Sequence, residues 1–181
     1  MSILSSPRHR RGFVSVSTLM LIVVAFGCAA LIGQRVVERS AQDALATATV
    51  RDHAGKLVPL VPKGQPTVVM VSSRTCSWCK KALADFGTMA NGEPIPGLTL
   101  FTLEGATEGA PMLEKEKLRG ARLVGPAGSR EAAEKLFKYP GTPTFLAFDR
   151  TGRIVHTIPG YPIRPELARL FAVMVRETDV P

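Results

Sequence analysis

The chain has 181 residues, 45% of them apolar and 21% charged, which is the composition of a folded protein with one ordinary domain and an extension. Its net charge of +8 comes from basic residues that are spread along the chain and often neighbour acids, as in Glu114-Lys115-Glu116-Lys117. Aromatic residues make up 6% of the chain and occur singly, so no basic and aromatic surface of the kind that binds nucleic acid is visible.

The first predicted element is a membrane segment. Residues 12–33 contain no charged side chain, and as a helix they would run about 33 Å, enough to cross the hydrocarbon core of a membrane. Because this stretch is apolar on every side, it does not fit a helix of a soluble core, which has one polar face. Arg8, Arg10 and Arg11 precede it, so the positive-inside rule places residues 1–11 in the cytoplasm and the rest of the chain outside.

Other interpretations of this segment stay open. Gly27-Cys28-Ala29-Ala30 partly fits the end of a cleaved signal peptide. Ala25-Phe26-Gly27-Cys28 is similar to a lipoprotein cleavage site, although Phe26 is bulkier than that pattern expects and Ala25 replaces its usual aliphatic residue. Arg11-Gly12-Phe13 is similar to a prepilin leader, although Ser17 stands where pilins carry a glutamate. We favour an uncleaved anchor, in which Cys28 is a small apolar residue in the membrane.

The next ranges lead into the folded domain. Residues 34–50 mix charged residues with alanine and predict a helical stalk, and residues 51–56 predict a turn that opens a domain over residues 51–181. A short strand is expected at residues 57–61. The following strand, residues 67–72, is apolar on both faces, as expected for a central strand that helices cover on both sides.

A pair of cysteines follows this strand, in the sequence Thr75-Cys76-Ser77-Trp78-Cys79-Lys80-Lys81. Residues 76–90 carry apolar side chains at helical spacing, so the two cysteines lie in the first turn of a predicted helix, where they can close a small disulfide ring. Unpaired backbone N–H groups and the helix dipole favour an anion there. We therefore expect Cys76 to form a thiolate of lowered pKa that attacks disulfides, with Cys79 as the more buried resolving thiol.

Strands and helices are expected to alternate in the rest of the chain. Residues 98–103 predict a strand, which completes a strand–helix–strand unit of the size that a right-handed crossover requires. The remaining expected elements are helices at 110–123 and 129–139, the second capped by Ser129, a hairpin of strands 144–148 and 154–158, and a final helix opened by Pro165.

Gly141-Thr142-Pro143-Thr144 stands directly before the first strand of this hairpin. Proline is unusual there unless its N–H is not needed or its peptide bond is cis. An X-Pro bond is cis only about one time in twenty, but a CxxC helix upstream reverses these odds. A cis bond between Thr142 and Pro143 is therefore expected.

With these motifs the chain resembles the thioredoxin-like superfamily, from residue 51 to about residue 176. The Thr-Cys-Ser-Trp-Cys-Lys motif, Gly-Thr-Pro-Thr and Pro159-Gly160-Tyr161 with the later Pro-Glu-Leu are most similar to the catalytic domain of bacterial periplasmic disulfide isomerases and thiol-disulfide interchange proteins. The resemblance implies an α/β thioredoxin-like fold, a central mixed sheet flanked by helices, here preceded by the transmembrane helix. It also implies a redox-active Cys76–Cys79 disulfide, with no metal and no other cofactor.

The resemblance assigns roles residue by residue. Cys76 would be the nucleophile and Cys79 the resolving thiol. Thr142 and Pro143 would belong to a loop that packs against the disulfide, and the Thr142 backbone would pair with an extended client segment. Such pairing gives affinity without sequence specificity. Ser77 and Trp78 would tune the thiolate, and Trp78 would also offer an apolar face to an unfolded client.

Three departures from the family narrow this hypothesis. Met70 stands where thioredoxins carry a buried carboxylate that helps to deprotonate the resolving thiol, and Thr75 stands where they carry tryptophan. Both changes point away from a cytosolic general reductase and towards the periplasmic branch. Residues 34–50 are too short to supply the N-terminal domain through which the isomerases dimerise, which favours a tethered monomer.

Three other classes of protein compete with this one. A zinc site would need further ligands besides the cysteine pair, and Cys28, His53 and His156 do not have ligand spacing. A purely structural disulfide would normally close a longer loop, because the stabilisation grows with loop length. The remaining alternative is a client-specific binding or assembly factor that uses the same groove with little or no redox turnover.

The function expected from the sequence is that of a membrane-tethered periplasmic thiol-disulfide oxidoreductase, of reductase or isomerase type more than a general oxidase. Its expected location is the bacterial inner membrane, with a cytoplasmic N-terminus and a periplasmic C-terminal domain. Its expected partners are exported proteins with cysteines and a membrane electron donor or acceptor for the cysteine pair, without nucleic acid.

Overall fold

The computed structural model describes residues 20, 21, 23–27, 43–137 and 141–175. The chain divides into two units, Met1–Arg39 and Ser40–Pro181, which are considered separately. In the first unit the described residues are helical and exposed, and most of the predicted membrane segment, with Cys28, lies outside them. Among the described residues, no helix combines the length and the apolar character that a membrane crossing needs.

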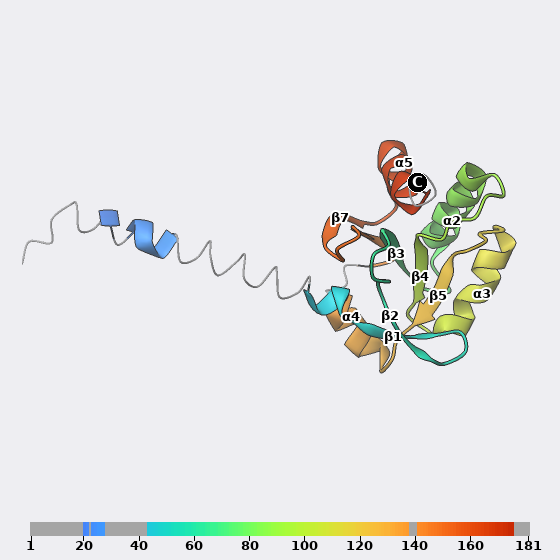
Figure 1. The fold of residues 1–181 in the computed structure, drawn as a ribbon, viewed down its shortest axis with the longest axis horizontal. Helices are drawn as coiled ribbons and strands as arrows, with labels where there is room; N and C mark the ends of the chain where they lie inside the picture. Colours follow the sequence, from blue (N-terminus) through green and yellow to red (C-terminus); the bar gives the residue numbers. More distant parts are fainter. Residues whose placement is uncertain (1–19, 22, 28–42, 138–140, 176–181) are drawn as a thin grey trace, which may run out of the picture. The chain divides into compact units, whose positions relative to one another are not determined.

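The second unit is built on a seven-stranded mixed sheet with the strand order β2-β1-β5-β4-β3-β6-β7 (Figure 1). Its central strand β3 is parallel to β4 and antiparallel to β6, and β4 is parallel to β5. Both ends of the sheet are antiparallel, where β1 pairs with β5 and β2 and where β6 pairs with β7. The strands are β1 (Thr49–Asp52), β2 (Leu57–Pro59), β3 (Thr67–Ser72), β4 (Leu98–Thr102), β5 (Arg122–Gly125), β6 (Thr144–Phe148) and β7 (Ile154–Pro159).

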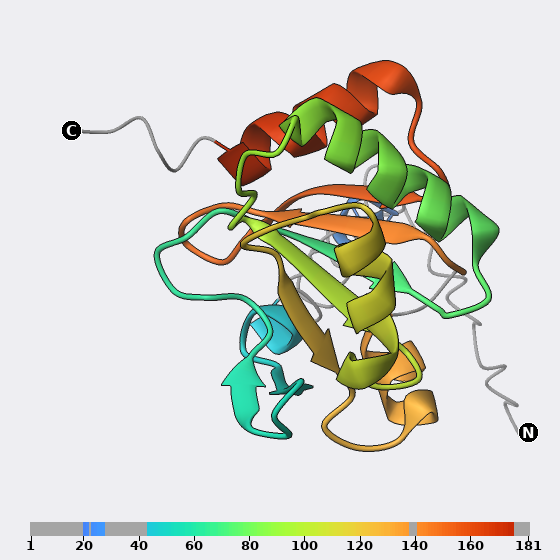
Figure 2. The same cartoon turned by 90° about the vertical axis from the view of Figure 1, so that its right-hand side faces the viewer.

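Four labelled helices cover this sheet: α2 (Ser77–Ala90), α3 (Ala106–Lys115), α4 (Arg130–Phe137) and α5 (Arg164–Val175). Figure 2 shows α2 and α5 together on one side of the sheet and α4 on the other. The mixed sheet with helices on both faces confirms the α/β thioredoxin-like architecture that the sequence predicts.

Alternate residues of β3 face two separate cores, because successive side chains of a strand point to opposite faces. Val68 and Met70 belong to the core under α2 and α5, whereas Val69 and Val71 belong to the core that includes α4. All four side chains are fully buried. In the first core the Phe86 ring of α2 meets the Phe145 ring of β6 edge to face, with ring centroids 6.1 Å apart. The helix that carries the cysteines is thus anchored directly on the centre of the sheet.

Most predicted elements agree with the structure. The strand at residues 67–72 has the expected bounds, the cysteine helix begins one residue later than expected, and the hairpin and the last helix are present. Ser129 caps α4 as expected, since its hydroxyl oxygen accepts the backbone N–H of Ala132 at 3.2 Å. The turn of the hairpin is closed by Asp149, whose Oδ1 accepts two backbone N–H groups and a hydroxyl.

Two ranges differ from the prediction. The single helix expected at residues 110–123 is wrong, because the chain forms α3 at Ala106–Lys115 and then strand β5 at Arg122–Gly125. β5 is short and pairs with strands distant in sequence, so its own residues give little local signal. In the range expected to be a helical stalk, residues 43–46 are helical, but Thr49 and Val50 form the start of β1, and residues 34–42 lie outside the described part of the chain. β1 continues through Arg51 and Asp52, so the predicted turn at residues 51–56 is wrong for its first two residues.

Candidate active site

The two cysteines lie where the central strand passes into α2. Cys76 has extended backbone geometry and occupies the N-cap position of the helix, and its Sγ accepts the backbone N–H of Cys79 at 3.0 Å. The two residues form a disulfide with Cα atoms 5.2 Å apart. Cys76 is partly exposed, whereas Cys79 is fully buried in the core under α2 and α5.

This arrangement gives the two sulfurs different chemistry. The Cys76 sulfur lies at the positive end of the helix dipole with an N–H group directed at it, which stabilises negative charge on it. The Cys79 sulfur is reached by a partner only through Cys76, because its own side chain is buried. The positions therefore fit the predicted roles of nucleophile and resolving thiol, which stay predictions.

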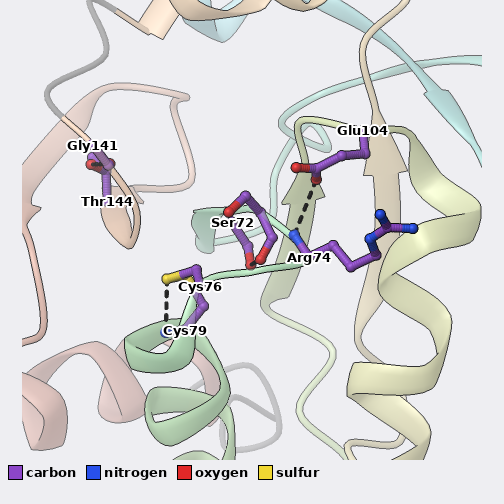
Figure 3. The surroundings of a disulfide bond; sticks show 8 residues. Ser72, Arg74, Cys76, Cys79, Glu104, Gly141 and Thr144 are labelled. Atoms are coloured by element: carbon purple, nitrogen blue, oxygen red, sulfur yellow. Dashed lines mark hydrogen bonds between the residues drawn. A yellow bond between two sulfur atoms is a disulfide. The ribbon is translucent and has the colours of Figure 1, made fainter.

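Glu104 holds the loop that leads from β3 to Cys76. Its Oε2 accepts the backbone N–H of Arg74 at 3.2 Å, and its Oε1 lies 3.6 Å from a guanidinium nitrogen of Arg130 in α4. The Arg74 guanidinium in turn reaches Glu108 at 3.4 Å. Figure 3 shows the Glu104 carboxylate next to Arg74, with a dashed line for the hydrogen bond between them. No motif in the sequence points to Glu104, because 30 residues separate it from Arg74.

The Thr142–Pro143 loop lies near the end of β3 that leads to Cys76. Its peptide bond is cis, which confirms the conformation expected from the sequence. Because Val71 of β3 pairs with Thr144 of β6, the start of β6 lies beside the end of β3 that leads to Cys76. Pro143 is buried and its carbonyl oxygen accepts the backbone N–H of Gly160 at 2.8 Å. Thr142 is partly buried, and its predicted pairing with a client stays a prediction.

A cluster of aromatic and charged side chains includes Trp78, which stands between the two cysteines in the sequence. The Trp78 side chain is 56% exposed and its ring lies against that of Tyr161, with centroids 5.4 Å apart. The Tyr161 hydroxyl donates to the Asp85 carboxylate, and the Lys81 ammonium lies 3.5 Å from that carboxylate and 4.9 Å from the centre of the Tyr161 ring. A hydrogen bond with Tyr161, followed by the charge of Asp85, raises the pKa of Lys81 above its usual range.

The remaining sequence predictions concern neighbouring positions. Ser77 is exposed in the first turn of α2. Met70, at the place of the thioredoxin carboxylate, is fully buried and belongs to the same core as Cys79, so the resolving thiol lies in apolar surroundings. His53 lies in the turn between β1 and β2 and His156 lies on β7, both exposed. Within residues 43–137 and 141–175 no cluster of His, Cys, Asp or Glu could hold a metal ion.

A CxxC disulfide at the N-terminus of the helix after the central strand defines a thiol-disulfide oxidoreductase built on the thioredoxin-like fold. The family model described as "Thioredoxin-like domain" matches residues 56–174, and the chain belongs to this family. No match was found among the curated proteins.

Solved structures give the same result for the fold. A thio-disulfide isomerase from Thermus thermophilus is 17% identical with a TM-score of 0.54, over 71% of this chain and 92% of that one. A secreted Mycobacterium tuberculosis disulfide oxidoreductase is 16% identical with a TM-score of 0.52, over 72% and 98%. A thioredoxin-like protein from Porphyromonas gingivalis is 17% identical with a TM-score of 0.55, over 72% and 91%. At these identities the likeness concerns the fold alone.

Proposed function

We propose that the protein is a membrane-tethered periplasmic oxidoreductase that reduces or rearranges disulfides in exported proteins. The observation that carries this proposal is the Cys76–Cys79 pair, with Cys76 partly exposed at a helix N-terminus and Cys79 buried. A sulfur in that position is stabilised as a thiolate, which is the attacking species in disulfide exchange.

The reaction proceeds in two exchange steps. The Cys76 thiolate attacks one sulfur of a client disulfide, so that a mixed disulfide forms and the other client sulfur leaves as a thiolate. The Cys79 thiolate then attacks the Cys76 sulfur, closes the intramolecular disulfide and releases the second client sulfur. Two electrons pass from the protein to the client. A dithiol donor at the membrane has to return the pair to the reduced state by the same exchange chemistry.

The membrane tether and the compartment rest on the sequence. Residues 12–33 carry no charge and follow Arg8, Arg10 and Arg11, which supports an inner-membrane anchor with the C-terminal domain in the periplasm. A disulfide oxidoreductase of Mycobacterium tuberculosis with the same fold is described as secreted. A single anchor would also confine the domain to clients near the membrane.

The experiment that tests this function is thiol trapping in intact cells. Cells are quenched in acid, free thiols are labelled with a mass-shifting alkylating reagent, and the redox state of Cys76 and Cys79 is read from the band positions. A reductase or isomerase is expected to be mostly reduced, because a donor recharges it. A mostly oxidised pair would contradict this direction and favour an oxidase.

A Cys76→Ala variant separates catalysis from client binding. Exchange chemistry requires the outer sulfur, so the variant is expected to lose all function in cells while it stays folded and correctly located. Retained function in Cys76→Ala cells would instead indicate a factor that holds its client without redox turnover.

A further inference from the structure

Tyr161 connects three parts of the site that are distant in sequence. It belongs to the connection between β7 and α5, where the preceding Gly160 N–H donates to the carbonyl oxygen of Pro143 at 2.8 Å. Its ring lies against Trp78 and its hydroxyl donates to Asp85, both of which belong to α2. A continuous set of contacts therefore runs from the Pro143 loop through Tyr161 to the tryptophan between the two cysteines.

The orientation of Tyr161 is fixed more strongly than that of Trp78. The tyrosine ring is partly buried, its hydroxyl has a carboxylate acceptor, and the Lys81 ammonium lies 4.9 Å from its centroid. Trp78 is 56% exposed, so most of its indole surface faces solvent. A large exposed side chain has several rotamers available unless a neighbour restricts it. The tilted ring contact with Tyr161 provides that restriction.

We infer that Tyr161 is a positioning residue: it fixes the indole of Trp78, which stands between the two cysteines in the sequence, as a preformed apolar contact for the residue next to a client's cysteine. This inference rests on the proposed function and adds a preference for clients with an apolar or aromatic residue at that place. A contact side chain that is immobilised before binding does not have to be ordered by the client. The expected gain in affinity is roughly two- to twelve-fold.

The test uses the purified full-length chain and the fact that Trp78 is its single tryptophan. Fluorescence anisotropy decay therefore reports the local motion of Trp78 without interference. In Tyr161→Ala the fast local motion of the indole is expected to increase, whereas Tyr161→Phe keeps the ring contact but loses the hydrogen bond to Asp85 and should show a smaller increase. Tyr161→Leu, which retains much of the apolar volume without a ring, serves if the alanine variant does not fold. Urea unfolding establishes which variants are folded.

The same variants are assayed as reduced proteins with three disulfide substrates. Two are glutathione mixed disulfides of short peptides that differ in one residue beside the cysteine, phenylalanine or serine, and the third is glutathione disulfide. We expect the wild type to have a lower KM for the phenylalanine peptide. Loss of the Tyr161 ring should raise this KM about five-fold, with kcat, the serine peptide and glutathione disulfide changed by less than two-fold.

Each outcome decides the inference. Unchanged Trp78 motion in the ring-deleted variants overturns it, whatever the kinetics show. An equal loss with all three substrates also overturns it, because Tyr161 would then act on the cysteine chemistry or on the fold in general. A wild-type protein that reduces none of the substrates contradicts the proposed function instead, and the motion of Trp78 still decides whether Tyr161 positions it.

Discussion

Removal of the Glu104 carboxylate is expected to weaken the loop that presents Cys76. In Glu104→Ala the backbone N–H of Arg74 loses its acceptor at 3.2 Å and Arg130 loses an ion-pair partner at 3.6 Å. A hydrogen bond to a charged group contributes about 1.5–3 kcal/mol, and the lower end applies because the Glu104 side chain is 25% exposed and the bond is long. The exposed ion pair adds less than about 1 kcal/mol. The free energy of unfolding should therefore fall by about 2 kcal/mol, which lowers Tm by about 6 °C.

Urea unfolding followed by circular dichroism measures this loss, and two variants serve as controls. Glu104→Gln keeps an oxygen acceptor without the charge and should lose about half as much. Glu108→Ala removes only the exposed ion pair with the Arg74 guanidinium and should lose less than about 0.5 kcal/mol. Amide exchange at the Arg74 N–H should accelerate in Glu104→Ala. The reasoning is refuted if Glu104→Ala unfolds within about 0.5 kcal/mol of the wild type, or if Glu108→Ala costs as much.

Three further predictions follow from the structure. In Cys79→Ser the resolving attack is lost, so clients should remain disulfide-linked to the protein and appear as reducible bands on non-reducing gels; their absence would contradict the assigned roles. In Gly97→Ala the new Cβ would lie 2.7 Å from the backbone Cα of Met174, and urea unfolding should show a loss of about 1–3 kcal/mol. A hydrogen bond from the Thr151 hydroxyl is the main cause that lowers the pKa of Asp149 below 3.8. The ionised Asp149 carboxylate therefore stabilises the folded domain above about pH 4, and this stabilisation is lost as the pH falls further. The destabilisation by Asp149→Ala should therefore shrink between pH 7 and pH 3 in urea titrations, and a constant difference would disprove this assignment.

The cysteine pair and its helix could be predicted because the information is local. The apolar run before Cys76, the helical spacing after it and the position of the thiols in the first turn all lie within residues 67–90. The cis bond before Pro143 could also be predicted, since a proline directly before a buried strand is compatible with few backbone arrangements. These are the parts of the fold in which sequence neighbours are also neighbours in space.

The helix predicted at residues 110–123 is wrong because the information that defines α3 and β5 is not local. α3 begins at Ala106 and contains Pro111 in its interior, a residue that normally marks a helix start or a break. The helix packs closely against β4 and β5: a Cβ added at Gly109 would lie 2.8 Å from the Thr102 side chain. This packing outweighs the tendency of Pro111 to break the helix. β5 itself is defined by its pairing with β4 and β1, which no local pattern records.

The supporting residues of the site could not be predicted for the same reason. Asp85 and Tyr161 are 76 residues apart in the sequence, and neither belongs to the cysteine motif. Tyr161 is part of the Pro159-Gly160-Tyr161 motif, but its contact with Trp78 depends on how the chain after β7 packs against α2. The sequence could thus predict the disulfide pair, whereas the contacts around Trp78 required the folded chain.

The short span of the disulfide has a consequence for repeated turnover. Cys76 and Cys79 are three residues apart within one helical turn, so closing the bond restricts the unfolded chain by only about 2 kcal/mol on a loop-entropy estimate, against about 3 kcal/mol for a loop of 15 residues. Cys79 remains packed in the core through the contacts of α2, which do not depend on the S–S bond. Oxidation is therefore expected to change the stability of this domain less than the closure of a longer loop would. We expect the domain to keep the same fold in both oxidation states, so that the cysteine pair can be oxidised and reduced repeatedly without unfolding of the chain.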